Sequence, residues 1–262
     1  MDFISETVER GVVERRFDLK VGDNVVPGII WTPEDAAATT PTILIGHGGT
    51  QHKRVPNVLS LARRLVRHQR YAAVAIDAPD HGDRVVDVQA AETARRALEQ
   101  RLQAGKQEGG GPRPAFAPET ARAWAERIRL GVLEWKATVD AIQPLTGGPL
   151  GYWGVSMGTV IGLPFVASEP RVSAAVLGLA GLSGRPGGAD FEAAARSLTT
   201  PVLMLFQWDD ELASRESGLA LYDAFASAEK SLHINPGGHI QIPFWERDAT
   251  EAFFVRHLGP PR

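Results

Sequence analysis

The stretch 150–159 carries the residue types and the spacing of a reactive serine. It reads Leu-Gly-Tyr-Trp-Gly-Val-Ser-Met-Gly-Thr, with Ser156 midway between Gly154 and Gly158. Glycines two residues before and two after the serine allow a strand and a helix to approach where any side chain would collide. The run before Ser156 predicts a short buried strand, and the apolar segment after it predicts a helix. We therefore expect Ser156 on a sharp, strained turn that pushes its hydroxyl outward.

A serine hydroxyl attacks well only when a histidine accepts its proton and a carboxylate orients that histidine. Both groups follow predicted strands downstream. His239 comes after two glycines and a strand predicted at 231–234, and these glycines allow its ring to reach back over the sheet edge. The strand predicted at 202–206 ends at Gln-Trp-Asp-Asp-Glu, residues 207–211, which supplies a carboxylate at the same edge. The order serine, acid, histidine predicts Ser156 as nucleophile and His239 as base.

The elements that must position these groups alternate along the chain. Strands at 12–20 and 25–31 are predicted to form an antiparallel hairpin around the turn at 22–24. From residue 42 onward, apolar strands alternate with helices, which predicts right-handed parallel crossovers and helices on both faces of a sheet. The further strands are predicted at 42–46, 72–76, immediately before Ser156, and at 174–179, 202–206 and 231–234. We expect one domain over residues 1–262, because neither an internal repeat nor a boundary is visible.

Residues 77–118 form a longer connection than is usual between a strand and a helix. A helix is predicted at 90–104, and the glycine- and proline-rich run at 105–114 predicts a mobile loop. Two interpretations stay equally open, a surface excursion without consequence and a lid inserted over the site.

With elbow, acid and histidine in this order, the chain resembles the α/β-hydrolases, and in layout the dienelactone hydrolase-like serine esterases. The resemblance covers the chain from Val12 onward. It implies the α/β-hydrolase fold, which has a mostly parallel central sheet, an antiparallel N-terminal hairpin and helices on both faces. It also implies a serine hydrolase that acts on carboxylic esters and needs neither a cofactor nor a metal. In such enzymes the acid lies three residues after a glycine that ends the seventh strand. Gln207 holds that place here, which implies Asp210 rather than Asp209.

The tetrahedral intermediate of acyl transfer carries an oxyanion, and preorganised N–H donors stabilise it by roughly 3–4 kcal/mol each. Met157, directly after the nucleophile at the start of a helix, is one expected donor. The sequence His47-Gly48-Gly49-Thr50 resembles the His-Gly-x oxyanion loop of the family. The resemblance implies Gly49 as the second donor, with Thr50 as the alternative.

Two departures from the family limit what the resemblance implies. Dienelactone hydrolases proper use a cysteine nucleophile, and this chain has no cysteine, so the relation concerns architecture and not substrate. Many relatives place a large cap after the sixth strand, where this chain has only residues 181–200. Any lid must therefore come mainly from residues 77–118.

The composition excludes several classes of function. The absence of cysteine excludes disulfides and thiolate zinc sites, and a net charge of -3 provides no basic face for nucleic acid. The N-terminus is acidic, and no apolar run reaches the length of a membrane span. We therefore expect a cytoplasmic protein with a small-molecule ester substrate, without a nucleic-acid or membrane partner. A metal site at Asp80, His81 and Asp83 is disfavoured because no further ligands stand at metal-binding spacing.

Three questions stay open from the sequence. A peptidase or a thioesterase would use the same triad, and a catalytically silent α/β-hydrolase fold would serve binding alone. Trp153, Trp208 and Trp245 each neighbour a catalytic element, so an apolar acyl pocket and ordinary packing explain them equally well. The oligomeric state is not encoded in any pattern that we recognise.

Overall fold

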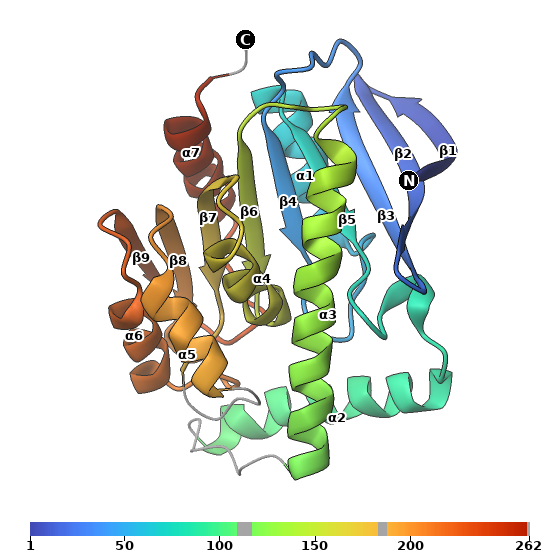
Figure 1. Ribbon diagram of the computed structural model, residues 1–262. Helices are drawn as coiled ribbons and strands as arrows, with labels where there is room; N and C mark the ends of the chain where they lie inside the picture. Colours follow the sequence, from blue (N-terminus) through green and yellow to red (C-terminus); the bar gives the residue numbers. More distant parts are fainter. Residues whose placement is uncertain (109–116, 183–187, 261–262) are drawn as a thin grey trace.

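The computed structural model describes residues 1–108, 117–182 and 188–260, and in them nine strands form one sheet. The strands are β1 (Asp2–Glu9), β2 (Val12–Val21), β3 (Asn24–Pro33), β4 (Thr42–Gly46), β5 (Ala72–Ile76), β6 (Leu150–Val155), β7 (Val172–Gly178), β8 (Val202–Gln207) and β9 (Lys230–Asn235). Their order across the sheet is β1-β2-β3-β5-β4-β6-β7-β8-β9 (Figure 1). The pairs from β1 to β5 are antiparallel, and those from β5 to β9 are parallel. The predicted mostly parallel sheet with an antiparallel N-terminal hairpin is confirmed.

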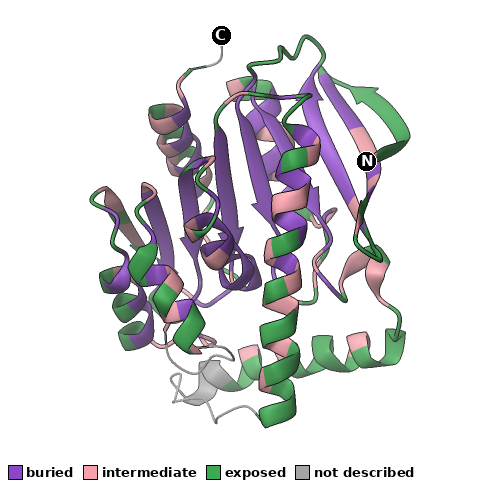
Figure 2. Cartoon of the chain, in the orientation of Figure 1, coloured by how far each residue is buried: buried purple, intermediate pink, exposed green. Residues whose placement is uncertain are grey.

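Helices cover both faces of this sheet. They are α1 (Pro56–Gln69), α2 (Val88–Glu108), α3 (Pro118–Ile142), α4 (Met157–Ala167), α5 (Gly188–Ser197), α6 (Arg215–Ala224) and α7 (Glu246–Leu258), with a short 3-10 helix η1 (Gly82–Arg84). One core contains buried residues of α3, α4, α5 and α6, and the second core contains those of α1 and α7. Figure 2 shows the central strands β4 to β8 as the most buried part of the chain, whereas β1 is exposed.

The local sequence explains these elements. In α1 the apolar positions Val58, Leu61, Ala62, Leu65 and Val66 are all buried on one face, as their spacing predicts. Every residue of β4, β5 and β6 is buried, because helices lie on both sides of the parallel strands.

Three sequence predictions about elements are incomplete or wrong. Strand β1 was not expected, because all eight of its residues are exposed and an edge strand without a buried face has no apolar alternation. Helix α5 lies in the stretch that was expected to be only a glycine-rich connection. Helix α2 continues through residues 105–108, where a loop was predicted, because a single glycine among good helix formers costs only about 1 kcal/mol. The remainder of that predicted loop, 109–114, lies outside the described residues.

Helix α2 differs from the helices that cover the faces of the sheet in its position and its exposure. It crosses the end of the molecule at which the parallel strands have their carboxyl ends (Figure 1). From residue 88 to residue 104, each side chain is exposed or half-buried.

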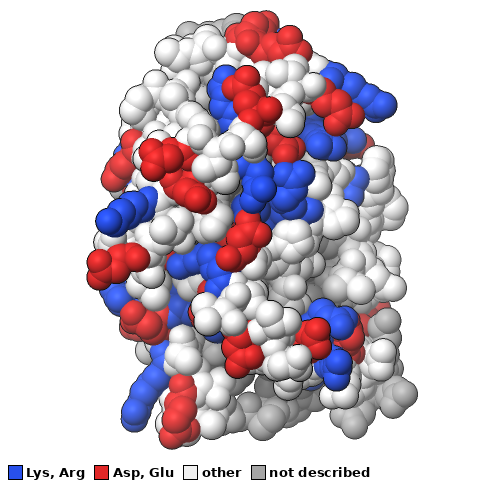
Figure 3. All heavy atoms as spheres, turned by 90° about the vertical axis from the view of Figure 1, so that its right-hand side faces the viewer, with Lys and Arg blue, Asp and Glu red and all other residues white. Residues whose placement is uncertain are grey.

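The surface near the N-terminal strands carries both signs of charge. Figure 3 shows lysine and arginine side chains interspersed with aspartate and glutamate on this face. Arg15 pairs with Glu6 at 2.5 Å, and Arg16 pairs with Asp83 at 3.0 Å. Among the helices of the described residues, none is long and apolar enough to cross a membrane.

Candidate active site

Ser156 lies on the turn between β6 and α4, as predicted. Its backbone has φ 57° and ψ -119°, a conformation that is costly for a residue with a side chain. The Ser156 N–H donates to Gly178 O of the neighbouring strand β7 at 2.9 Å, and Ser156 O accepts from the N–H groups of Thr159 and Val160. These bonds hold the turn although the conformation is strained.

Both glycines of the pentapeptide, Gly154 and Gly158, lie where a Cβ would clash with backbone atoms. A Cβ on Gly154 would lie 2.7 Å from the carbonyl oxygen of Gly158. A Cβ on Gly158 would lie 2.7 Å from the carbonyl oxygen of Gly46, at the end of β4. Helix α4 therefore begins in direct backbone contact with β4 and β6, which is the close approach that the motif predicts.

The change Gly158→Ala is expected to destabilise the protein by about 2 kcal/mol, because the new methyl group meets rigid backbone atoms of Gly46. Chemical denaturation measures this change in the free energy of unfolding. Gly188→Ala is the matched control, since a Cβ there meets nothing within 4 Å. Equal stability of the two variants would contradict the packing argument.

His239 joins Ser156 to Asp210. The Ser156 Oγ lies 2.9 Å from His239 Nε2, and His239 Nδ1 lies 2.9 and 2.8 Å from the two carboxylate oxygens of Asp210. Because the carboxylate only accepts, Nδ1 carries the proton and Nε2 is left to accept from the serine hydroxyl. The three side chains come from the loops after β6, β8 and β9 and meet at one edge of the sheet. The structure thus brings together the three residues that the sequence selected.

The two neighbouring aspartates point to different partners. Asp210 is buried, and its Oδ1 also accepts the N–H groups of Leu212 and Ala213 at 2.7 and 2.9 Å. Asp209 is exposed and pairs with Arg215 at 3.1 Å. The backbone N–H bonds orient the Asp210 carboxylate toward His239, whereas Asp209 has no contact with the ring among the hydrogen bonds of the described residues.

Gln207 occupies the place where the family has a glycine. Its side chain is fully buried at the end of β8, and its Nε2 donates to the carbonyl oxygens of Gln241 and Pro236 at 2.7 and 3.4 Å. Both acceptors belong to the loop that carries His239. The departure from the family pattern therefore adds a tie between the loop of the acid and the loop of the base.

The loop after β4 lies against the start of α4. A Cβ on Gly49 would be 4.0 Å from Met157 Cβ, so the two expected oxyanion donors are neighbours. Neither the Gly49 N–H nor the Met157 N–H donates to another group within the described part of the chain. The Gly48 N–H, by contrast, donates to Gln51 Oε1 at 3.2 Å. Two backbone donors are thus free at this corner. Thr50, the alternative donor, has φ 59°.

His47 holds this loop in place through a neutral ring. The Ala78 N–H donates to His47 Nε2 at 3.0 Å, so Nδ1 must carry the proton and donate to Gly48 O at 2.8 Å. Burial lowers the pKa of His47 to about 4, with a smaller lowering effect from His81, whose ring centroid lies 5.4 Å away. His47 is therefore a structural group of the loop.

This low pKa makes stability depend on pH. The folded-state pKa of His47 lies below its ordinary value, so the unfolded chain takes up a proton first as the pH falls. The contribution is complete above pH 6.5 and is lost as the pH falls toward 4, by up to about 3 kcal/mol. Urea unfolding of the wild type and of His47→Gln across this range measures it, because glutamine does not titrate. Parallel pH profiles for the two proteins would count against the assignment.

A buried ion pair ties the same loop to the loop after β5, and no pattern in the sequence indicated it. Lys53 Nζ contacts Asp77 Oδ2 at 2.5 Å and Asp83 Oδ2 at 2.7 Å, and the Lys53 N–H donates to Asp77 Oδ1 at 2.9 Å. Lys53 and Asp77 are almost completely buried. Breaking one partner of such a pair leaves an uncompensated buried charge, so the contact fixes both loops firmly.

Backbone strain is concentrated at the ends of the parallel strands. Six residues other than glycine have a positive φ in the described chain, and four of them follow β4, β5, β6 and β7. They are Thr50, Asp80, Ser156 and Leu179, with φ between 51° and 62°. Such strain is typical of functional sites, and here it marks the sheet edge that carries Ser156.

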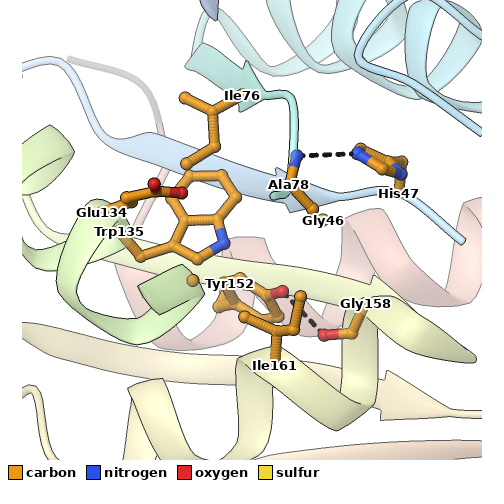
Figure 4. A pocket seen from close by; sticks show the side chains of 10 residues that line it. Gly46, His47, Ile76, Ala78, Glu134, Trp135, Tyr152, Gly158 and Ile161 are labelled. Carbon is orange, nitrogen blue, oxygen red and sulfur yellow. Dashed lines mark hydrogen bonds between the residues drawn. The ribbon is translucent and has the colours of Figure 1, made fainter. Parts of the chain in front are cut away.

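A small cavity lies behind the elbow, between α3 and the first turn of α4 (Figure 4). Its volume is about 10 Å³, near the minimum for one water molecule. Trp135 and Tyr152 form part of its wall, and Tyr152 Oη donates to Gly158 O at 2.7 Å. The cavity is too small for a substrate and belongs to the packing that supports the elbow.

The residues of the disfavoured metal site, Asp80, His81 and Asp83, contact other groups. Asp80 pairs with Arg127, Asp83 pairs with Lys53, and His81 Nδ1 contacts Pro79 O at 2.8 Å. Among the described residues, no group of three or more metal-ligating side chains is present. Trp153 is buried in the core, whereas Trp208 and Trp245 are exposed, so ordinary packing explains only the first of these tryptophans.

Solved structures of two esterases and a dienelactone hydrolase are similar to this chain. No protein-family model matches this chain, and no curated protein matches it. Among solved structures, a cold-adapted esterase from an Arctic intertidal metagenomic library is 35% identical, with a TM-score of 0.80 over 98% of this chain and 100% of that one. A dienelactone hydrolase from Anabaena variabilis is 18% identical, with a TM-score of 0.64 over 95% of this chain and all of that one. An acetyl xylan esterase from Paenibacillus is 14% identical, with a TM-score of 0.70 over 98% and 88%.

The chain belongs to the α/β-hydrolase superfamily as a relative of the 35% identical esterase, and it shares its fold with the dienelactone hydrolase. The predicted family and fold are thereby confirmed.

Proposed function

We propose that this protein is a serine esterase that cleaves carboxylic esters through an acyl-enzyme. The observation that carries the proposal is the unbroken set of contacts from Ser156 Oγ through His239 to Asp210, with distances of 2.8–2.9 Å. It is supported by 35% identity to a protein described as an esterase.

In the proposed mechanism, Ser156 Oγ attacks the carbonyl carbon of the ester while His239 Nε2 takes the hydroxyl proton. The carbonyl oxygen becomes an oxyanion and accepts the N–H groups of Gly49 and Met157. Collapse of this intermediate breaks the bond to the alcohol, which leaves with the proton from His239. A water molecule then attacks the acyl-enzyme with the help of His239 and releases the acid and free Ser156. Asp210 stabilises the imidazolium in both halves.

No cofactor takes part in this scheme, and a small-molecule ester is the proposed substrate. The experiment that tests it is a panel of p-nitrophenyl esters, lactones, thioesters and peptide amides, with fluorophosphonate labelling of Ser156 in parallel. Turnover of esters above the other classes is the expected result. Preference for amides or thioesters would favour a peptidase or a thioesterase. Absence of both labelling and turnover would favour a catalytically silent binding protein.

We also propose that residues 1–262 form one domain and that the insertion at 77–118 acts as a lid. Support for the lid comes from the position of α2 at the carboxyl end of the strands and from the exposure of its side chains, none of which is fully buried between residues 88 and 104.

The least exposed apolar side chains in the middle and later turns of α2 are Leu98 and Leu102. If α2 contacts the acyl chain, Leu98→Gln raises KM for long esters and leaves KM for acetate esters unchanged. The cytoplasmic location expected from the sequence stays a prediction.

A further inference from the structure

Glu211 contacts the backbone of His239, and the proposed mechanism gives Glu211 no role. Its Oε2 accepts the His239 N–H at 2.7 Å. The same carboxylate lies against the preceding residue, because a Cβ on Gly238 would be 2.4 Å from Glu211 Oε1. Gly238 therefore provides the space in which the carboxylate reaches the histidine.

Two consecutive carboxylates thus hold one histidine from two sides. Asp210 accepts from the ring at Nδ1, and Glu211 accepts from the main chain of the same residue. The loop itself is easily deformed, since it contains Gly237, with φ 104°, and Gly238 in succession. Gln207 ties the same loop at Pro236 and Gln241, on either side of His239. Glu211 accepts the N–H of His239 itself, and a shift of the main chain at this residue carries Nε2 with it.

We infer that Glu211 is a positioning residue that fixes the main chain of His239 at the distance from which Nε2 can take the proton of Ser156. The inference rests on the proposed triad. The ring nitrogen stands 2.9 Å from the serine oxygen, and a displacement of about 1 Å at a catalytic group can lower the rate about 100-fold. Glu211 acts on the histidine and has no contact with the reacting atoms.

The first test compares truncation with an isosteric change. Glu211→Ala removes the acceptor and is expected to lower kcat about 100-fold while KM stays within about twofold. Glu211→Gln keeps an oxygen that accepts the His239 N–H and is expected to retain kcat within about threefold. A loss in KM rather than kcat, or an equal loss in both variants, would overturn the role of the hydrogen bond.

The second test displaces Glu211 without changing it. Gly238→Ala places a methyl group where the carboxylate lies, and the flexible end of the Glu211 side chain is what must move. We expect Gly238→Ala to lower kcat as much as Glu211→Ala, and to have less than a twofold effect when Glu211 is already alanine. Additive losses in the double variant would show that the two residues act independently and would refute the inference. This variant also serves if Glu211→Ala unfolds.

Two further proteins separate this inference from the proposed function. Glu216→Ala truncates an exposed carboxylate in the first turn of α6 and is expected to keep kcat within about twofold. Ser156→Ala reports on the triad itself. Loss of activity in Ser156→Ala with full activity in both Glu211→Ala and Gly238→Ala would reject the role of Glu211 alone. Full activity in Ser156→Ala would reject the triad on which the inference rests.

Discussion

Replacing Ser156 with alanine is expected to lower the turnover of ester substrates by up to about six orders of magnitude. The size follows from the contacts of the hydroxyl: the Ser156 Oγ is the atom that faces His239 Nε2 at 2.9 Å, and no bond to the acyl group can form without it. Alanine keeps a Cβ at the same strained φ, so the backbone of the turn is not expected to change. The measurement is kcat for p-nitrophenyl acetate, together with a thermal unfolding curve for each protein.

The control for this prediction is Ser173→Ala, which removes an exposed hydroxyl at the start of β7, the end of the strand opposite Gly178, the residue that contacts the elbow. It should leave kcat unchanged. A Ser156→Ala protein that is folded and retains near-full esterase activity would exclude Ser156 as the nucleophile, and the proposed mechanism with it.

The second large effect is expected for Asp210→Asn, which should lower kcat about 10⁴-fold. The asparagine oxygen can still accept the N–H groups of Leu212 and Ala213, so its NH2 group faces His239 Nδ1. That nitrogen must then accept, the ring proton moves to Nε2, and the histidine can no longer take the proton from Ser156. The geometry is preserved and the tautomer is wrong.

Asp209→Asn is the matched partner of this variant, with the same chemical change one residue earlier. Because Asp209 is exposed and pairs with Arg215, we expect kcat within about twofold of the wild type. A 10⁴-fold loss in Asp209→Asn, with Asp210→Asn nearly unaffected, would show that the acid is Asp209 and not Asp210.

The neighbouring carboxylates at 209–211 illustrate what a sequence can and cannot specify. Their types and their place after a strand indicated an acid at this edge. Which of them faces the histidine depends on the direction of each side chain in the turn that follows β8, and that direction is set by the fold. Asp209 faces Arg215, Asp210 faces the imidazole ring, and Glu211 faces the backbone of His239. The family register selected Asp210, but nothing in the sequence pointed to Glu211.

Strands and helices also differ in whether the sequence could predict them. Strands and helices with a buried face were predictable from apolar periodicity, as in α1 and β4. Strand β1 is exposed over its whole length, so its residues carry no such pattern. Its existence depends on pairing with β2, in the register Val8 with Val13 and Glu6 with Arg15.

By itself, the sequence determined the fold family and the turn that carries Ser156, and it led to the proposal of His239 as the base, because these depend on local patterns and on the order of motifs along the chain. Only the tertiary structure decided how the loops are held. Lys53 and Asp77 are 24 residues apart, and Glu211 and His239 are 28 residues apart. Contacts at such separation arise when parallel strands bring their carboxyl ends to one edge, and no spacing rule along the chain records which side chains then meet. The precise geometry on which catalysis depends is therefore a property of the folded sheet edge.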